Sequence, residues 1–252
     1  MEGHAQTDAN PARSIAAADA VVAFSEVRFC WPGKSHFSLA IDKFELFRGE
    51  RLLLIGPSGS GKSTFLSLLA GIVVPQSGRI EVLGTDTTAL NGAARDRFRA
   101  EHFGIIFQMF NLLPYGSVID NVMLPLSFSA ERNKRAGGDA QCRASAERIL
   151  TALGLERSLI NGAKASSLSV GQQQRVAAAR ALIGAPEIIV ADEPTSALDR
   201  NLQVAFLDLL FGETKAAGSS LIMVSHDESL SPRFDRTLRL DDIAVASRGD
   251  RP

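Results

Sequence analysis

The chain has 252 residues, of which 45% are hydrophobic and 22% are charged, and its formal net charge at pH 7 is −1. This composition is typical of a globular protein with one main core, and the balanced charge indicates no overall preference for nucleic acid or an anionic membrane surface. Cys30 and Cys142 are too few and too far apart in sequence to predict a disulfide framework or a metal site. Because no apolar run approaches the ~20 residues that cross a bilayer, we expect a cytoplasmic protein that reaches a membrane through a partner.

We expect the N-terminal part of the chain to consist of a tail followed by several β-strands. Residues 1–20 are rich in alanine and aspartate and lack the apolar segment of a secretory signal, so we expect a flexible tail there. Apolar and polar residues alternate in Val21–Phe29, Phe37–Ile41 and Phe44–Leu46, which predicts a small, mainly antiparallel β layer. Trp31, the only tryptophan, is either an ordinary core or surface aromatic or a flat platform for an adenine ring, and its position alone does not decide between these.

A glycine-rich loop follows the next expected strand. Four apolar residues at 52–55 lead into G-P-S-G-S-G-K-S-T, which matches the phosphate-loop pattern G-x-x-x-x-G-K-[ST] and opens a helix. Inward backbone N–H groups and the helix N-terminus attract phosphate, the lysine reaches the β- and γ-phosphates, and the serine after it holds Mg²⁺. We therefore predict a nucleoside triphosphate site that contains Gly56, Pro57, Ser58, Gly59, Ser60, Gly61, Lys62, Ser63 and Thr64.

The rest of the chain alternates apolar strands with helices. The expected strands cover residues 79–83, 104–107, 188–191 and 221–224, and the expected helices cover 91–100, 173–183 and 202–217. Residues 118–155 have a helical pattern apart from the polar stretch 129–141, which predicts a loop, and we place a helical lobe at about 95–180 within one domain of residues 21–245. Such alternation predicts an α/β fold with a parallel sheet and ligand chemistry at the carboxyl ends of its strands.

Chemically useful side chains follow three of these strands. Asp192 is typical of the carboxylate that helps to place Mg²⁺ in nucleotide hydrolysis, and the adjacent Glu193 is a candidate base for an attacking water. Gln108 and His226 each lie within two residues of another strand end. A lone histidine is more often structural than catalytic, so His226 depends on its context.

That context is a set of motifs that resembles the ATP-binding-cassette (ABC) ATPases. The set comprises the phosphate loop, L-S-V-G-Q at 168–172, the run from Asp192 to Asp199, and His226. The resemblance extends in the same order from about residue 21 to residue 240. It implies a P-loop NTPase fold with a mainly parallel central sheet, an N-terminal antiparallel β layer and a helical lobe that carries the signature.

The resemblance assigns roles to residues around one nucleotide. It implies that Trp31 stacks on adenine, that Gln108 senses Mg²⁺ and the attacking water, and that Ser63 and Asp192 help to hold Mg²⁺. It also implies that Glu193 is the catalytic base and that His226 contacts the γ-phosphate. ATP and Mg²⁺ are the cofactors expected for this chain.

The same resemblance implies a dimer with a second copy of this chain or a closely similar partner, because the family's signature closes over the nucleotide of the opposite chain. Ser169, Gly171 and Gln172 match this signature, and Asp199 matches the loop residue that crosses the dimer interface. The common signature is L-S-G-G-Q, whereas this chain has Val170 at the third position. Valine resists a positive φ, so either this position tolerates ordinary helical geometry or the composite site is weakened. Because Ser169 and Gly171 match the signature, we favour tolerance.

Three classes of function share the phosphate loop. The favoured one is the ATPase subunit of a membrane transporter with a separate permease, which would hold the cassette at the inner face of the cell membrane. A soluble ABC ATPase acting on chromosomes or ribosomes would need a long coiled coil or two cassettes, and the chain has no heptad run between Lys62 and Ser169. A metabolic P-loop kinase would lack the signature. We therefore expect no nucleic acid partner.

The branch of the family is suggested by residues 99–108 and 110–114. They resemble cassettes of the lipoprotein-release and macrolide-export branch, and polar amino-acid importers resemble them nearly as well. Met109–Tyr115 is a loop rich in large apolar side chains, which are either core residues or a contact for a partner. We expect the permease to contact region 108–125, with Phe110 and Leu113 in the contact.

Overall fold

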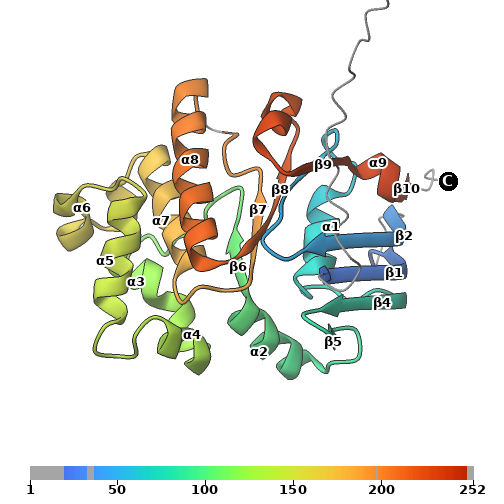
Figure 1. Cartoon of the computed structure of the whole chain (residues 1–252), viewed down its shortest axis with the longest axis horizontal. Coiled ribbons are helices and arrows are strands. Elements are labelled where there is room, and N and C mark those ends of the chain that lie inside the picture. The colour runs from blue at the N-terminus through green and yellow to red at the C-terminus, as the bar shows by residue number, and fades with distance from the viewer. Residues whose placement is uncertain (1–19, 33–36, 197, 249–252) are drawn as a thin grey trace, which may run out of the picture.

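Two β-sheets and a group of helices make up the fold in the computed structural model, which describes residues 20–32, 37–196 and 198–248 (Figure 1). Within these residues, one five-stranded sheet has the order β10-β2-β1-β4-β5 and the other has the order β6-β7-β8-β3-β9. The expected tail at residues 1–20 lies almost wholly outside the described residues, so it stays a prediction.

The first sheet is antiparallel, as predicted for residues 21–46, but it also contains the strand at 77–82, which was expected among the strands of the parallel sheet. β1 (Ala20–Cys30) pairs with both β2 (Phe37–Phe47) and β4 (Ser77–Val82), β4 pairs with β5 (Thr85–Asp86), and β10 (Val245–Arg248) pairs with β2. β2 is one strand where two were expected, because Ile41 and Lys43, on either side of the exposed Asp42, keep the same register with β1. β10 returns from the end of the chain and was not predicted.

The second sheet is parallel in all its pairings, which confirms the expected central sheet. It contains β3 (Arg51–Ile55), β6 (Phe103–Ile106), β7 (Ile188–Asp192), β8 (Ser220–Ser225) and β9 (Arg236–Arg239). β9 was not predicted, because its sequence R-T-L-R has two arginines and no apolar run. In the structure most of its residues are half-buried. β3 lies between β8 and β9, so the phosphate loop leaves the interior of the sheet and not its edge.

Alternate residues of β3 face two different cores. Leu53 and Ile55 belong to a core shared with the helices, whereas Leu52 and Leu54 belong to a core shared with the antiparallel sheet. The second core includes Phe65 of α1, whose ring stacks on Phe24 with centroids 5.3 Å apart. Period-two alternation in one strand thus joins both halves of the molecule.

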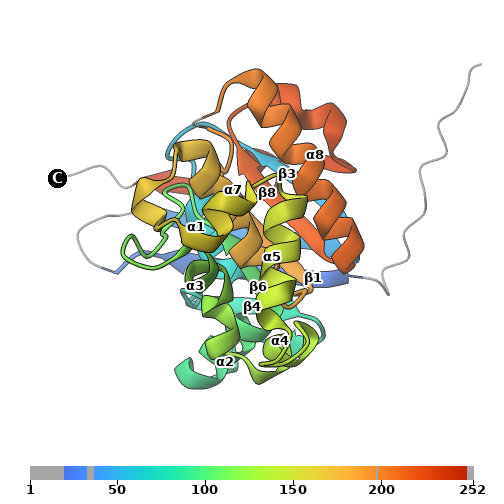
Figure 2. The ribbon, with the colours of Figure 1, turned by 90° about the vertical axis from the view of Figure 1, so that its left-hand side faces the viewer.

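Helices cover the parallel sheet, and Figure 2 shows α3, α5 and α7 in front of β6 and β8. The α-helices are α1 (Lys62–Leu69), α2 (Gly92–His102), α3 (Val118–Met123), α4 (Ala130–Arg135), α5 (Cys142–Ala152), α6 (Arg157–Gly162), α7 (Val170–Leu182), α8 (Arg200–Ala217) and α9 (Leu240–Ile243). Short 3₁₀ helices are η2 (Leu124–Ser127), η3 (Ala165–Ser167) and η4 (Glu228–Arg233). None of the helices in the described part of the chain combines the length and apolarity needed to cross a bilayer.

α4 corrects one expectation, because it lies inside the stretch 129–141 that was predicted to be a loop. Ser129 caps the helix by accepting a hydrogen bond from the backbone N–H of Arg132. The buried side chain of this helix is Arg132 and not an apolar residue. Hydrophobic periodicity therefore gives no signal for α4.

Candidate nucleotide-binding and catalytic site

The phosphate loop and the carboxyl ends of β6 and β7 surround a cavity of about 510 Å³, which is in the range of small-molecule sites. Its lining includes a residue of the antiparallel sheet and residues that follow strands of the parallel sheet. Its lining residues are Trp31, Phe37, Ser58, Gly59, Gly61, Lys62, Ser63, Thr64, Gln108, Asp192 and Glu193. Ten of these eleven were named as site residues from the sequence, and the exception is Phe37.

The loop leaves space for a ligand only because two of its positions are glycine. Gly61 has φ 109°, and a Cβ there would lie 2.7 Å from the ring of Phe37. A Cβ on Gly56 would lie 2.8 Å from the hydroxyl of Ser60. That buried hydroxyl has no hydrogen-bond partner among the described residues. An orphaned polar atom inside a glycine loop fits an anionic ligand that would supply the missing contact.

The side chain of Lys62 is buried within the phosphate loop. Its side chain is only 6% exposed, and its ammonium donates to the carbonyl oxygens of Gly56 at 2.7 Å and Pro57 at 3.0 Å. The same ammonium lies 3.5 Å from the Glu193 carboxylate. A buried ammonium requires such partners, and phosphate oxygens can take their place.

Ser63 and Asp192 form the candidate magnesium site. The Ser63 hydroxyl donates to the Asp192 carboxylate at 2.9 Å, which links the start of α1 to the end of β7. Burial raises the pKa of Asp192, and the negative charge of Glu193 adds to this, while the Ser63 hydrogen bond opposes it. One hydroxyl and one carboxylate fit the way Mg²⁺ binds, with few protein ligands and the rest from phosphate and water. Gln108 lines the same cavity.

Glu193 is held in an unusual backbone conformation beside that pair. Its φ is 44°, and its backbone N–H donates to the carbonyl of Val224 on β8 at 3.0 Å. Nδ1 of His226 lies 2.9 Å from its carboxylate. A positive φ is strained for a residue with a side chain and marks functional sites more often than other positions. This conformation aims the Glu193 carboxylate at Lys62 and the cavity.

Trp31 lies at the mouth of the cavity. Its indole N–H donates to the hydroxyl of Thr64 at 3.1 Å, and its ring packs edge-on against Phe29. The side chain is still 37% exposed, so one part of the ring remains open to a ligand. Sequence reasoning missed Phe37, whose alternation in a strand gave no sign that its ring would reach Gly61.

The signature residues lie elsewhere. Figure 1 shows α7 on the opposite side of β6 from α1, and the described residues that line the phosphate cavity include none of Ser169, Gly171 and Gln172. Ser169 caps α7 through a reciprocal pair of hydrogen bonds with Gln172. Val170 is the first residue of α7, is 48% exposed and has no positive φ, so a β-branched residue is free of strain here.

Asp199 does not line the cavity either. Its carboxylate caps α8 by accepting from the backbone N–H groups of Asn201 and Leu202, each at 3.0 Å. Ala197, in the same motif, lies outside the described residues. The structure thus assembles the phosphate loop, Gln108, Asp192 and Glu193 in one place, whereas the signature residues and Asp199 lie at the starts of helices outside this cavity.

The apolar loop after Gln108 is of mixed character, which corrects the expectation for Phe110. Phe110 is only 8% exposed and belongs to the core with Val118 and Ile119. Met109 and Tyr115, in contrast, are 81% and 75% exposed. Phe110 therefore serves the fold, and it is not a surface contact for a permease.

Comparison with known proteins agrees with this geometry. A family model described as "ABC transporter" matches residues 39–196. The chain is 40% identical over 225 residues to the lipoprotein-releasing system ATP-binding protein LolD of Novosphingobium aromaticivorans, which covers 88% of this chain and 96% of that protein. It is 42% identical over 200 residues to the macrolide export ATP-binding/permease protein MacB 1 of Aeromonas hydrophila, covering 79% of this chain and 30% of that longer protein.

A solved structure supports the same conclusion. The dimeric cassette MJ0796, bound to ADP and Pi in a post-hydrolysis state, superposes with a TM-score of 0.72 and 32% identity over 86% of this chain and 93% of that chain. The similarity therefore extends over most of both chains. With the family model and the relatives above, this chain belongs to the ABC transporter family and is one of its nucleotide-binding ATPase subunits.

Proposed function

We propose that this chain dimerises on ATP and powers a separate membrane permease of the export or envelope-lipoprotein type. The observation that carries the proposal is that one chain assembles only half of the expected composite nucleotide site. The phosphate loop, Asp192 and Glu193 share one cavity, whereas none of the signature residues at the start of α7 lines it. A second cassette would complete each site, and the relative MJ0796 is a dimer.

The residues of the cavity divide the work of hydrolysis. Lys62 would exchange its loop carbonyls for the β- and γ-phosphates, and the Ser60 hydroxyl would gain a partner. Ser63, Asp192 and Gln108 would hold Mg²⁺, which when bound neutralises phosphate charge. Glu193 would accept the proton of the attacking water, and His226, 2.9 Å away, orients its carboxylate.

A groove beside this site supports a permease contact. Its volume is about 530 Å³, and it lies between α2, β6 and η2. Apolar side chains such as Phe107, Leu124 and Phe128 line it together with arginines. This surface fits an amphipathic helix. Asn111, Leu124 and Pro125 lie in the region 108–125 proposed for the permease, which would hold the cassette at the inner face of the membrane.

The cargo class rests on the relatives. LolD is named for lipoprotein release and MacB for macrolide export, and we assign this chain to that branch and not to the amino-acid importers. The permease that copurifies with the tagged cassette tests this assignment. We expect a protein with four spans and a large extracytoplasmic domain. A permease of the importer kind that restores ATP-driven uptake would overturn the assignment.

The sole tryptophan permits a direct test of the nucleotide site. Adding ATP should change the fluorescence of Trp31 in a saturable way, and hydrolysis should require Mg²⁺. Lys62→Ala should weaken nucleotide binding, because it removes a charge-assisted contact to phosphate. Unchanged Trp31 fluorescence at saturating ATP in the folded wild-type protein would contradict the site assignment.

A further inference from the structure

Arg132 on α4 is a buried arginine without a carboxylate partner. The residue is 2% exposed, and among the described residues none of its contacts is an ion pair. Burial lowers the pKa of its guanidinium to about 10, the neighbouring Arg135 adds to the effect, and the negative charge of Glu187, which forms no ion pair with it, opposes it. The group remains protonated at pH 7, so its charge must be satisfied by backbone oxygens.

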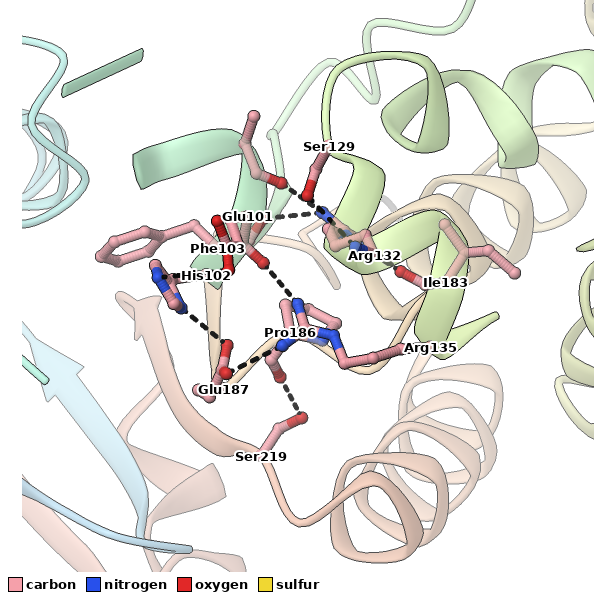
Figure 3. A network of polar contacts seen from close by, with 11 residues as sticks. Glu101, His102, Phe103, Ser129, Arg132, Arg135, Ile183, Pro186, Glu187 and Ser219 are labelled. Carbon is pink, nitrogen blue, oxygen red and sulfur yellow. Dashed lines mark hydrogen bonds and ion pairs between the residues drawn. The ribbon is translucent and has the colours of Figure 1, made fainter. Parts of the chain in front are cut away.

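The backbone oxygens that accept these hydrogen bonds lie at the end of helix α7 and at the start of strand β6. Nε donates to Ile183 O at 3.0 Å and Nη2 donates to Ala181 O at 3.0 Å, both at the carboxyl end of α7. Nη1 donates to Phe103 O at 2.9 Å, at the start of β6. Figure 3 shows both arginines of α4 reaching toward this part of the chain. A cation satisfies helix-terminal carbonyls that have no partner within the helix.

The backbones at this junction are in close contact. A Cβ on Gly104 of β6 would lie 2.1 Å from Ala181 O, so only glycine allows α7 to sit on the strand at this point. The buried face of α7 there consists mainly of alanines. Alanine side chains let the backbones of α7 and β6 approach closely, but they are too short to interdigitate with the residues they face. The guanidinium that bridges Ala181 O and Phe103 O therefore supplies the directional contact between helix and strand.

The other end of α7 carries the signature. The helix has 13 residues. It is therefore about 20 Å long, and a tilt of about 5° at its carboxyl end would move its N-terminus by about 1.7 Å. Binding groups must be held within about 0.5 Å to act well. Small changes at Arg132 would therefore matter at Ser169.

We propose that Arg132 is a positioning residue that sets the direction of α7, so that Ser169 and Gly171 meet the nucleotide of a second cassette. The inference rests on the proposed ATP-driven dimer. It assigns Arg132 no contact with nucleotide. Arg132 also lines the permease groove, so a segment bound there would touch the residue that orients the signature.

The test uses ATP-dependent dimerisation of the Glu193→Gln protein, measured by size exclusion. Adding Arg132→Lys, which keeps the charge but loses the fork of donors, should raise the dimer dissociation constant at least tenfold. Gly104→Ala should do the same by an independent route, because its Cβ would push α7 away. Nucleotide affinity of the monomer, read from Trp31 fluorescence, should stay within twofold for both variants.

Arg135→Lys is the matched control. Arg135 lies on the same helix and binds Glu187 at 2.9 Å and the carbonyl of Glu101 at 2.7 Å, and among the described residues it makes no hydrogen bond or ion pair with α7. Its variant should dimerise like the parent. Normal dimerisation of the Arg132→Lys protein would overturn the positioning role of Arg132 and would leave the proposed ATP-driven dimer unaffected. A variant that melts or loses nucleotide binding together with dimerisation would show that Arg132 serves the whole fold, and this also overturns the positioning role. Failure of the Glu193→Gln parent to dimerise would instead overturn the proposed composite site.

Discussion

Two cavities of similar size border the segment that follows β6, and their chemistry differs. Gln108 lines the phosphate cavity of about 510 Å³, whereas Phe107 and Asn111 line the groove of about 530 Å³. In the first, charged side chains contact one another, as Lys62 does with Glu193. In the second, Arg99 pairs with Asp96, but the two buried arginines bind backbone carbonyls alone within the described part of the chain, as Arg180 does with Phe110 O and Asn111 O.

The difference indicates what each cavity is built to do. Side chains that pair with each other can exchange those partners for a ligand without unfolding the loop. Arginines bound to carbonyls hold backbone segments together, and removing them leaves several buried oxygens unsatisfied. We infer that the first cavity performs chemistry and that the second transmits position. Four predictions test that division, from the largest expected effect to the smallest.

The first concerns chemistry in the phosphate cavity. Glu193→Gln keeps size and hydrogen bonding but removes the base, so ATP hydrolysis should fall by about 10²–10⁴-fold. ATP should still change the fluorescence of Trp31, since the phosphate loop is intact. Steady-state hydrolysis together with a fluorescence titration measures both effects, and wild-type turnover would remove Glu193 from its role.

The second concerns the apolar loop between the cavities. Phe110→Ala should lower the free energy of unfolding by about 3–5 kcal/mol, because it leaves a cavity in the core. Met109→Ala, one residue earlier but exposed, should change it by less than about 0.5 kcal/mol. Chemical denaturation of the two variants compares them directly. Equal stability would contradict the assignment of Phe110 to the core.

The third concerns the groove. Phe128 is 66% exposed and lines it. Phe128→Asp should abolish stimulation of hydrolysis by the permease and leave hydrolysis by the isolated cassette unchanged, because a charge would disfavour an apolar contact. Val245→Asp is the matched control, since Val245 is 72% exposed on β10 in the other sheet. Stimulation that survives in the Phe128 variant would place the permease elsewhere.

The smallest effect is expected at Val170. Its backbone has no positive φ, so Val170→Gly should change hydrolysis by no more than a few-fold. A gain of tenfold or more, equal to about 1.4 kcal/mol of barrier, would mean that valine weakens the composite site. Steady-state rates of both proteins at saturating ATP decide the matter.

The candidate catalytic residues could be named from the sequence because their chemistry depends on the local order of residues. The phosphate loop needs glycines at fixed spacing, and Asp192 and Glu193 directly follow an apolar strand. Strand ends of a parallel sheet meet at one edge, so these motifs converge without knowledge of the full fold. The expected antiparallel layer and parallel sheet are confirmed for the same reason, since their strands have clear apolar patterns.

Other features depended on contacts between distant segments. α4, β9 and β10 carry too few apolar residues to show a period, and Phe37 enters the cavity only because β2 passes beside the phosphate loop. Nothing in the sequence distinguishes buried Phe110 from exposed Met109. The partners of Arg132 are carbonyl oxygens, which every residue possesses. The sequence by itself therefore determined the phosphate chemistry, and only the tertiary structure decided which carbonyls a buried arginine binds, because that choice depends on how backbones far apart in the chain pack together.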